Sequence, residues 1–519
     1  MPREQQRYLL ALETWPGVCR MNAPFDRRLH EIYKGPNNEG PRWYDAKGVA
    51  GVPRSWYVPA TELPVIFAKA EALGYITRFL PAPRRTPLRP LPDDLLPHQA
   101  EAVLRAIDEG AILLQWDTGC GKTRAALETM AAVGGKAIVI APRSVVSVWR
   151  DQAERWGHTP FVTLSKSDPT EQPDRLLISY GELPRVLSSG YQWDVIVYDE
   201  LHYVMHSRSA RTTRAAALSL SSPGAVRVGL TATPVSVRMD NIHSQLHVLC
   251  PHRYGTHYQW TQHYHHITHD GYEGARVVGP LRDDRLAEFS ATLAEISSAV
   301  TQADLGDALP PTAWEVIKVA GNGAARPPNS LAKWRAEQTA LVSRRADAIG
   351  SEVSKIQGPV CVVTYLRATA KAAAESLGAD LVTGELPAAT RSAILKQSNN
   401  VVCTMMAIAE GLDMRRFTSP IIAEPYPVPR YMEQVIGRFV RLFATEPVTI
   451  KLLRLEGTSD EIIADRLVSR MKAQASVLKE SRTRQEFKAA LTVDENSDTF
   501  LKELREQFTD CNDEEDGWE

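Results

Sequence analysis

The chain has 519 residues, which is too many for one hydrophobic core and predicts about three domains. Its 60 Lys and Arg residues nearly balance 62 Asp and Glu residues, and the formal charge of −2 excludes a protein that coats nucleic acid through bulk positive charge. The six cysteines are scattered singly, which disfavours a disulfide framework or a cysteine-based zinc site and favours a reducing compartment. The sequence has no signal-peptide pattern and no apolar run of about 20 residues, so we expect a soluble intracellular protein without a membrane contact.

The N-terminal part of the chain differs in composition from the rest. Residues 1–83 are rich in aromatic, proline and arginine side chains, and we assign them to a small α+β domain. The prolines of residues 84–92 remove hydrogen-bond donors and block helix formation, which predicts an extended linker.

Two later parts of the chain share one pattern. In residues 93–255 and again in residues 312–470, apolar β-rich runs alternate with helical segments. Continuous apolar strands separated by helices predict a parallel sheet covered on both faces, so the fold class is α/β with two tandem parallel-sheet lobes. We expect residues 256–311 to form a mostly helical connection between the lobes, and residues 471–519 to form a helical extension with an acidic end.

The sequence WDTGCGKT (116–123) predicts a phosphate-binding loop. It follows the apolar run AILLQ and opens the helical pattern TRAALETM, which is the strand–loop–helix context that such a loop requires. Its glycines allow backbone N–H groups to turn toward phosphate oxygens, Lys122 supplies a positive charge, and Thr123 offers a hydroxyl to Mg²⁺. Trp116 stands where the strict pattern has its first glycine. The nucleotide-binding residues expected here are Thr118, Gly119, Cys120, Gly121, Lys122 and Thr123.

A second strand, DVIVYDELH (194–202), ends in two carboxylates. Carboxylates at the C-terminal end of a parallel strand lie at the edge of the sheet where ligands bind. We expect Asp199 to hold Mg²⁺ and Glu200 to polarise the attacking water, while His202 senses the γ-phosphate. The alternative, an ordinary acidic strand end, is disfavoured by the phosphate-loop pattern upstream.

With these motifs the chain resembles the superfamily 2 helicase-type ATPases, whose two lobes are RecA-like. LLPHQAEAV (95–103) is similar to the family's Q element and would place Gln99 on adenine, and TATP (231–234) resembles the motif that couples nucleotide state to nucleic-acid grip. TMMAIAEGLDM (404–414) resembles motif V and QVIGRFVR (434–441) matches motif VI. The resemblance implies ATP contacts by Gly411 and Asp413, catalytic roles for Gln434, Arg438 and Arg441, and nucleic-acid contacts by Thr231 and Thr404.

Finer details resemble the Swi/Snf-like branch of this superfamily. APRSVVSVWRDQAERW (141–156) is similar to that branch's motif Ia, which implies a contact between Ser144 and a DNA phosphate. SSAVTQADLGDALPP (297–311) is similar to its segment between the lobes, although the arginines expected there are absent, and GTSDEIIADRL (457–467) resembles the helix after its second lobe.

Residues 25–59 resemble the HARP-type module of annealing helicases. Basic and aromatic side chains alternate there, which suits phosphate contact and base stacking at exposed single strands. The nucleic-acid contacts expected are Arg42, Lys47, Arg54 and Trp56. The alternative is a small domain whose aromatic residues form its core.

Eight histidines fall within His243–His269, and His243 and His247 have a spacing that one metal ion accepts. No HExxH motif or cysteine partner accompanies them, so we do not assign a metal site there. The acidic tail is expected to be solvated.

We interpret the chain as an ATP- and Mg²⁺-dependent translocase on double-stranded DNA that remodels forked or branched DNA. Three alternatives stay open: the motor subunit of a restriction or defence complex, a DExH-type RNA helicase, and an ATP-gated clamp that binds junctions without moving. The expected partners are duplex, forked or branched DNA and a single-stranded-DNA-binding protein or a nuclease. We expect a monomer in the cytoplasm of a bacterial or phage-infected cell, or in the nucleus if the source is eukaryotic.

Overall fold

The computed structural model describes most of the chain. The described residues are 7–15, 18–23, 26–34, 43–44, 56–80, 85–164, 171–232, 239–251, 253–269, 276–301, 304–305, 312–320, 331–408, 414–424, 429–440, 446–461, 463–464 and 467. Among them, no helix is long and apolar enough to cross a bilayer.

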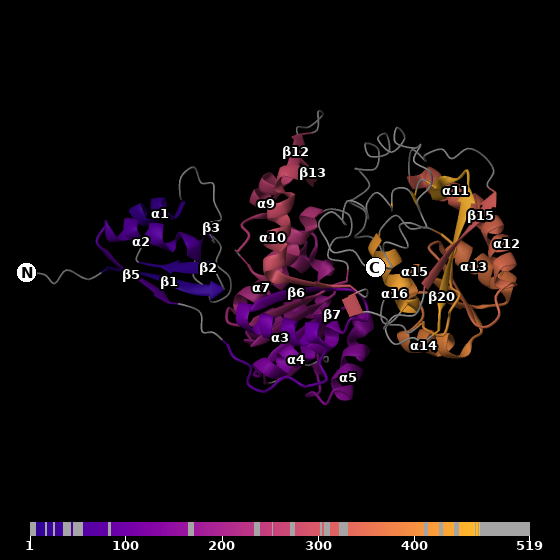
Figure 1. The fold of residues 1–519 in the computed structure, drawn as a ribbon, viewed down its shortest axis with the longest axis horizontal. Helices are drawn as coiled ribbons and strands as arrows, with labels where there is room; N and C mark the ends of the chain where they lie inside the picture. The colour runs from indigo at the N-terminus through magenta and orange to yellow at the C-terminus, as the bar shows by residue number, and fades with distance from the viewer. Residues whose placement is uncertain are drawn as a thin grey trace, which may run out of the picture. The chain divides into compact units, whose positions relative to one another are not determined.

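The N-terminal domain is a five-stranded sheet with two helices. Its strand order is β3-β4-β2-β1-β5, with β1 (Arg7–Trp15) parallel to β5 (Tyr75–Leu80). The other pairs, formed with β2 (Val18–Asn22), β3 (Trp43–Tyr44) and β4 (Trp56–Pro59), are antiparallel. Figure 1 shows α1 (Arg27–Lys34) and α2 (Leu63–Glu71) on one face of this sheet. Alternate residues of β1 point toward them, since Leu9 and Ala11 are buried in the same core as Leu29 and Ile66. The α+β prediction for this domain is confirmed.

Lobe 1 is a seven-stranded sheet with the order β14-β6-β11-β10-β7-β9-β8. Every neighbouring pair in it is parallel. The strands are β6 (Ala111–Trp116), β7 (Ala137–Ala141), β8 (Val162–Thr163), β9 (Arg175–Ser179), β10 (Val195–Asp199), β11 (Val226–Leu230) and β14 (Ser297–Val300). The helices between them are α3 (Pro97–Glu109), α4 (Lys122–Val133), α5 (Val146–Arg155), α6 (Leu183–Ser189), α7 (Ala210–Ser221) and α8 (Ile242–Leu249). Because β7 and β11 are buried along their whole length, both faces of this sheet are covered, as their apolar runs predict.

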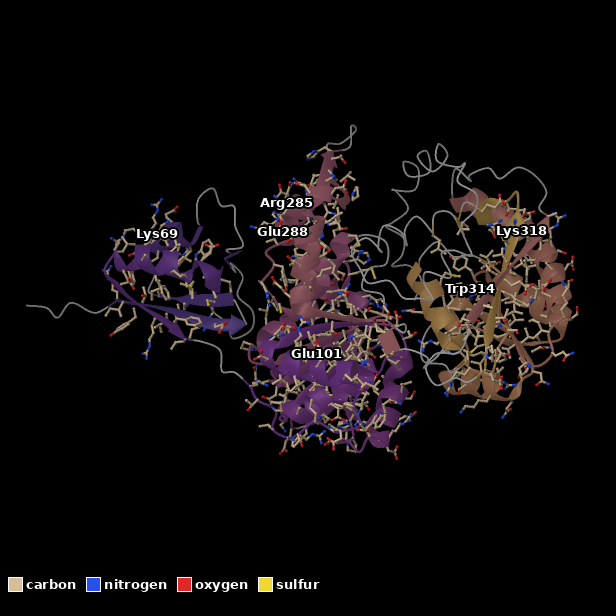
Figure 2. All side chains as sticks on the ribbon, in the orientation of Figure 1. Lys69, Glu101, Arg285, Glu288, Trp314 and Lys318 are labelled. Carbon is tan, nitrogen blue, oxygen red and sulfur yellow. The ribbon has the colours of Figure 1, made fainter. Side chains whose placement is uncertain are left out.

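The segment after α8 differs from the predicted helical connection. It contains α9 (His257–Tyr264) and α10 (Leu286–Ile296), but also the antiparallel pair β12 (His265–His269) and β13 (Arg276–Leu281). Figure 1 shows this pair projecting beyond the two helices, and Figure 2 shows Arg285 and Glu288 at the start of α10, where Arg285 Nη1 lies 2.7 Å from Glu288 Oε2. The chain then returns as β14, which pairs with β6. The four residues SSAV carry too little pattern to predict a strand, and only the pairing with a distant strand makes them one.

Lobe 2 is a six-stranded parallel sheet with the order β15-β20-β19-β16-β18-β17. Its strands are β15 (Thr312–Ala320), β16 (Val360–Thr364), β17 (Asp380–Val382), β18 (Asn400–Thr404), β19 (Ile421–Ile422) and β20 (Val448–Glu456). Its helices are α11 (Leu331–Ala340), α12 (Val342–Val353), α13 (Arg367–Leu377), α14 (Ala388–Gln397), α15 (Met405–Ile408) and α16 (Pro429–Phe439).

Alternate residues of β16 enter two separate cores of lobe 2. Cys361 and Val363 pack with α15 and α16, whereas Val360 and Val362 pack with α12 and α13. Figure 1 shows these helix pairs on opposite sides of β20. The edge strand β15 carries a charged residue, Lys318, labelled in Figure 2 with Trp314, and its Nζ lies 3.8 Å from Glu456 Oε1 of β20. The two-lobe α/β architecture is therefore confirmed.

Candidate nucleotide site and DNA-facing residues

The predicted phosphate loop lies at the carboxyl end of β6, between Trp116 and the first residue of α4, Lys122. Gly119 and Gly121 have φ of +87° and +84°, a left-handed backbone that glycine adopts without a steric cost. The Lys122 amine donates to the carbonyl oxygens of Trp116 at 2.6 Å and Asp117 at 3.1 Å. The positive charge is thus folded back over a loop whose glycines leave its backbone open to an anion.

The strand β14, which the sequence did not predict, supports the start of the phosphate loop. Trp116 is fully buried, and its indole N–H donates to Ser298 Oγ of β14 at 3.0 Å. The backbone N–H of Asp117 donates to the carbonyl of Val300 at 2.9 Å. The tryptophan in the place of the first glycine therefore fills a core position and anchors β6 to β14.

Gln99 packs against the phosphate loop. It is 6% exposed, its Oε1 accepts the N–H of Leu96 at 3.1 Å, and its Nε2 donates to the carbonyl of Gly121 at 3.4 Å. A Cβ at Gly121 would overlap the Gln99 amide, so this position requires glycine for space as well as for its φ. The structure brings the predicted adenine contact to the loop, and the contact with adenine itself stays a prediction.

Two carboxylates stand at the end of β10. Asp199 is the last residue of the strand, and Glu200 has φ +48° and ψ +54°, a left-handed backbone that is uncommon outside glycine. Such conformations cluster at functional sites, where the surrounding structure holds them. Burial, followed by the neighbouring Glu200, raises the pKa of Asp199 to about 7, while a hydrogen bond from Trp149 and the charge of Lys122 oppose the rise.

These residues fit a hard divalent cation. Carboxylate and hydroxyl oxygens are the ligands that Mg²⁺ prefers, and Asp199, with Thr123 as the second residue of α4, supplies them. Two adjacent acids with one pKa already raised would be stabilised by a cation, because a cation relieves their repulsion.

His202 joins this site to the next motif. Its Nδ1 lies 3.2 Å from Glu200 Oε2 and 3.3 Å from Thr231 Oγ1, and the imidazole is 4% exposed. Thr231 follows β11, is fully buried, and donates its N–H to the carbonyl of Leu114 at 3.1 Å. A single buried imidazole therefore contacts both the acidic motif (Asp199 and Glu200) and the TATP motif.

The structure describes only some of the catalytic, ATP-contacting and DNA-contacting residues that were predicted in lobe 2. Gln434 is buried on α16, Arg438 is half-buried on the same helix, and Thr404 ends β18 with 6% exposure. Arg441, Gly411 and Asp413 lie outside the described residues.

The predicted DNA contacts of lobe 1 and the N-terminal domain are also described in part. Ser144 lies in a 3₁₀ turn, Arg143–Val145, that leads into α5, but its side chain is outside the described set, as are Arg42, Lys47 and Arg54. Trp56 is 8% exposed, its ring stacks edge-on against His30, and it belongs to the domain core. The base-stacking role predicted for Trp56 is therefore wrong for this structure, because β4 directs that ring toward α1.

Two features of the site escaped the sequence analysis. Trp149 of α5 donates its indole N–H to Asp199 Oδ2 at 2.7 Å, although the sequence pattern singled out this tryptophan only as part of a family resemblance. Glu128 of α4 is 1% exposed and binds Arg89, Arg124 and His158 at 2.7, 3.0 and 3.0 Å. No local sequence pattern marks the Trp149–Asp199 contact or the contacts of Glu128 with Arg89 and His158, because these partners lie 30 or more residues apart in the sequence. Only Arg124 is a near neighbour of Glu128 in the sequence.

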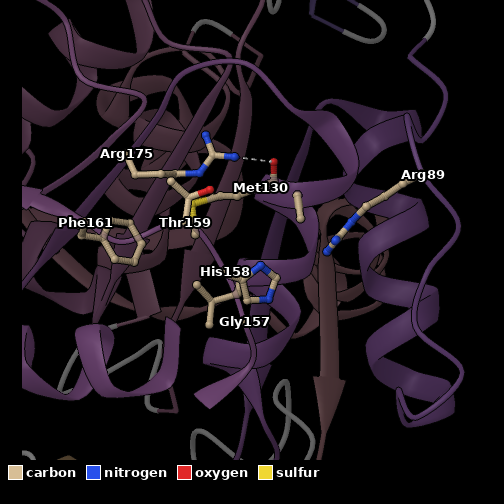
Figure 3. A pocket seen from close by; sticks show the side chains of 9 residues that line it. Arg89, Met130, Gly157, His158, Thr159, Phe161 and Arg175 are labelled. Carbon is tan, nitrogen blue, oxygen red and sulfur yellow. Dashed lines mark hydrogen bonds between the residues drawn. The ribbon is translucent and has the colours of Figure 1, made fainter. Parts of the chain in front are cut away.

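A pocket of about 220 Å³ adjoins Glu128, toward the end of α4 remote from the phosphate loop. Figure 3 shows Arg89, His158 and Arg175 around it, with Arg175 donating to the carbonyl of Met130 at 3.3 Å. The cations on its wall are occupied by Glu128 and by backbone carbonyls, so we assign the pocket no ligand.

The histidine-rich stretch forms part of a core. His243 packs against His247, His257 and Trp260, and its Nε2 lies 3.1 Å from the carbonyl of Gly255. Burial lowers the pKa of His243 to about 3 and that of His247 to about 4. Within the described ranges, no group of three His, Cys, Asp or Glu side chains could hold a metal ion.

Comparisons with known proteins agree with these motifs. The family of type III restriction enzyme res subunits matches residues 93–236. A Rad25-type DNA 3′–5′ helicase of Halobacterium salinarum is 30% identical over 170 residues, which cover 31% of this chain and 27% of that protein. The DNA annealing helicase and endonuclease ZRANB3 of Bos taurus is 23% identical over 445 residues, which cover 75% of this chain and 41% of that protein.

A solved SWI2/SNF2 ATPase core of Sulfolobus solfataricus in complex with dsDNA is 14% identical, with a TM-score of 0.38, over 76% of this chain and 98% of that one. The chain spans less than half the length of these curated relatives. The similarity to ZRANB3 spans most of the chain, and the matched family segment holds the phosphate loop and the DELH motif. The two parallel-sheet lobes, the matched family segment and the similarity to ZRANB3 support the resemblance of this chain to the Swi/Snf-like branch of the superfamily 2 helicases.

Proposed function

We propose that the chain is an ATP-dependent translocase on double-stranded DNA that remodels forked or branched DNA. One observation carries the proposal: Glu200, His202 and Thr231 form a continuous path from the acidic motif to the TATP motif. A static nucleotide-binding domain has no need of such a path, whereas a motor must transmit the state of its nucleotide.

In the proposed reaction, the phosphate loop binds ATP and Lys122 neutralises charge on the β- and γ-phosphates. Asp199 and Thr123 would hold Mg²⁺, which when bound supplies further charge neutralisation at these phosphates. Glu200 orients and polarises the attacking water, and its strained backbone keeps the carboxylate at the strand end.

Lobe 2 contributes at the transition state. Arg438 and Arg441 would reach the γ-phosphate when the lobes close, in the manner of arginine fingers, while Gln434 orients them. Turnover would then depend on DNA, because DNA bound to both lobes favours their closure. Ser144 is the proposed DNA contact and would hold a phosphate, so movement would be largely independent of sequence. Thr231 and Thr404, to which the resemblance assigns the same role, are buried at the ends of β11 and β18.

A second candidate follows from the family match. Type III restriction enzyme res subunits match the segment that contains the ATP site, so a motor subunit of a restriction complex is also compatible with the residues present. The two functions differ in substrate: a remodelling enzyme responds to branched DNA, whereas a restriction motor responds to continuous duplex.

The test is the ATPase rate of the full chain, titrated separately with single-stranded, duplex, forked and four-way DNA and with RNA. We expect strong stimulation by fork and four-way DNA, with Glu200→Gln as the inactive control. Stimulation by RNA alone would contradict the proposal, and equal stimulation by duplex and fork would favour the restriction motor. Failure to displace a DNA triplex despite ATP turnover would identify a clamp rather than a translocase.

A further inference from the structure

The buried face of α5 reaches the acidic motif. Trp149 and Ala153, one turn apart, are the buried residues of this helix, and Trp149 is 1% exposed. Its ring packs edge-on against Phe161 with centroids 6.1 Å apart. Its indole N–H, which can only donate, lies 2.7 Å from Asp199 Oδ2. The only polar group of the Trp149 side chain therefore donates to a carboxylate 50 residues away in the sequence.

Asp199 is fixed from three directions. Its Oδ2 accepts from Trp149, its Oδ1 accepts the N–H of Glu200 at 3.0 Å, and its backbone carbonyl accepts the hydroxyl of Tyr180 at 2.9 Å. Each carboxylate oxygen has two acceptor directions, so one direction per oxygen stays open for a cation or its water. The indole thus sets the rotation of the carboxylate without closing it to a ligand.

The same helix connects to the predicted DNA contact. The turn Arg143–Val145, which contains Ser144, ends where α5 begins at Val146, and Trp149 follows within the first turn. A shift of that turn would move α5 as a rigid element and with it the indole. Trp156, the residue that follows α5, offers a comparison, because its indole N–H donates to Gln152 Oε1 of that helix at 3.2 Å.

We propose that Trp149 is a positioning residue for Asp199, through which α5 couples the predicted DNA-contacting turn to the carboxylate that would hold the divalent cation. The inference rests on the nucleotide-site function proposed above. A group that orients a metal ligand through a hydrogen bond commonly accounts for about 10- to 100-fold in metal affinity or activity. Since linkage is reciprocal, DNA that shifts α5 would alter cation affinity, and the cation would alter DNA affinity by the same factor.

The experiment compares Trp149→Phe with Trp156→Phe, which make the same substitution within α5 and directly after its last residue. Both phenylalanines retain an aromatic ring and remove one N–H. The readout is the affinity for Mn²⁺, used as a paramagnetic probe and measured by electron paramagnetic resonance on the full chain saturated with a non-hydrolysable ATP analogue. Affinity for the same analogue in EDTA is measured in parallel.

We expect Trp149→Phe to weaken Mn²⁺ binding by about 10-fold or more, with nucleotide affinity in EDTA unchanged. Trp156→Phe should leave both values at the wild-type level. In wild type, adding duplex DNA should change the Mn²⁺ affinity, and in Trp149→Phe this response should be lost. Wild-type Mn²⁺ affinity in Trp149→Phe would overturn the inference alone, whereas a wild-type chain without nucleotide-dependent Mn²⁺ binding would overturn the proposed function with it.

A purely structural role for the ring is tested in an Asp199→Ala background. If Trp149 acts through Asp199, adding Trp149→Phe should change neither the remaining Mn²⁺ affinity nor the unfolding temperature beyond the change caused by Trp156→Phe in that background. A further loss in the double variant of the size seen in the single one would show that the indole acts independently of Asp199, and would overturn the inference.

Discussion

The guanidinium of Arg89 donates to the buried carboxylate of Glu128 at 2.7 Å. Arg89 lies in the stretch predicted as an extended linker, and Glu128 lies on α4, the helix that follows the phosphate loop. Neighbouring residues add contacts, since the backbone N–H of Leu88 donates to the carbonyl of Ala132 at 2.7 Å and Arg85 Nη2 donates to that of Gly224 at 2.5 Å. The described part of this stretch, which begins at residue 85, therefore lies on lobe 1 as an extended strap.

This strap determines where the N-terminal domain should be cut. We expect a chain without residues 1–80 to remain a folded, DNA-stimulated ATPase that no longer prefers fork over duplex DNA, because the contacts of Arg85–Arg89 stay in place. Its fork binding should also depend less steeply on salt, since phosphate contacts of the N-terminal domain are lost. The measurement is ATPase activation by a fork and by a matched duplex, with and without the domain. Unchanged fork preference would mean that the lobes recognise the junction.

The Glu128 cluster should be a stability determinant of lobe 1. Glu128→Gln removes the charge that Arg89, Arg124 and His158 share while keeping the shape of the side chain. Breaking a buried ion pair commonly costs roughly 3–5 kcal/mol, and the partial exposure of Arg89 should bring the loss toward the lower end. Urea denaturation measures it, with Glu101→Gln on the exposed face of α3 as the control (Figure 2). Equal midpoints for the two variants would contradict this role.

Local patterns located the phosphate loop and DELH motif, because each is a strand end followed by a turn with distinctive residues. The pairing of β14 with β6, the Arg89–Glu128 contact and the Trp149–Asp199 contact were not predictable in this way, since each joins segments far apart in the sequence. The Trp56 error has a similar cause. Alternating aromatic and basic residues describe a stacking surface and a domain core equally well, and only the sheet shows which face Trp56 occupies.

Lys122 and Glu200 should separate nucleotide binding from turnover. Lys122→Ala should abolish hydrolysis and weaken ATP binding, because it removes the charge held over the loop. Glu200→Gln should retain ATP and DNA binding and stop turnover. Lys136→Ala, which removes a lysine paired with Asp174 away from the loop, is the matched control and should turn over normally. Hydrolysis at the wild-type rate by Glu200→Gln would contradict the water-polarising role.

Arg438 should act on turnover rather than on binding. Arg438→Ala is expected to reduce DNA-stimulated ATPase by roughly 10³-fold or more, the range of an arginine finger, with nucleotide affinity nearly unchanged because lobe 1 carries most of that binding. Arg367→Ala, which removes an exposed arginine paired with Glu385 on lobe 2, should behave as wild type. The rate at saturating DNA decides the matter, and a normal rate in Arg438→Ala would refute the assignment.

The buried histidines predict how stability changes with pH. Burial lowers the pKa of His243 to about 3 and that of His247 to about 4, whereas an unfolded histidine titrates near about 6.5. The unfolded chain therefore binds protons as the pH falls below that value while the folded chain does not, so stability is present above it and is lost on acidification. Each histidine should contribute a slope of up to about 1.4 kcal/mol per pH unit in this window.

Asp240 and His257 lie beside His243 and His247, and the Asp240 carboxylate lies 3.2 Å from the His257 ring. Neither Asp240 nor His257 is changed in the variants compared. His243→Gln should reduce the slope of unfolding free energy against pH between about pH 6 and pH 5, because one titrating group is removed. His269→Gln, at the exposed end of β12, is the control and should keep the wild-type slope. Urea denaturation of the full chain measures both slopes, with the unfolding of lobe 1 monitored by hydrogen exchange of α8 and α9. An undiminished slope in His243→Gln would mean that other groups set the acid sensitivity of this lobe.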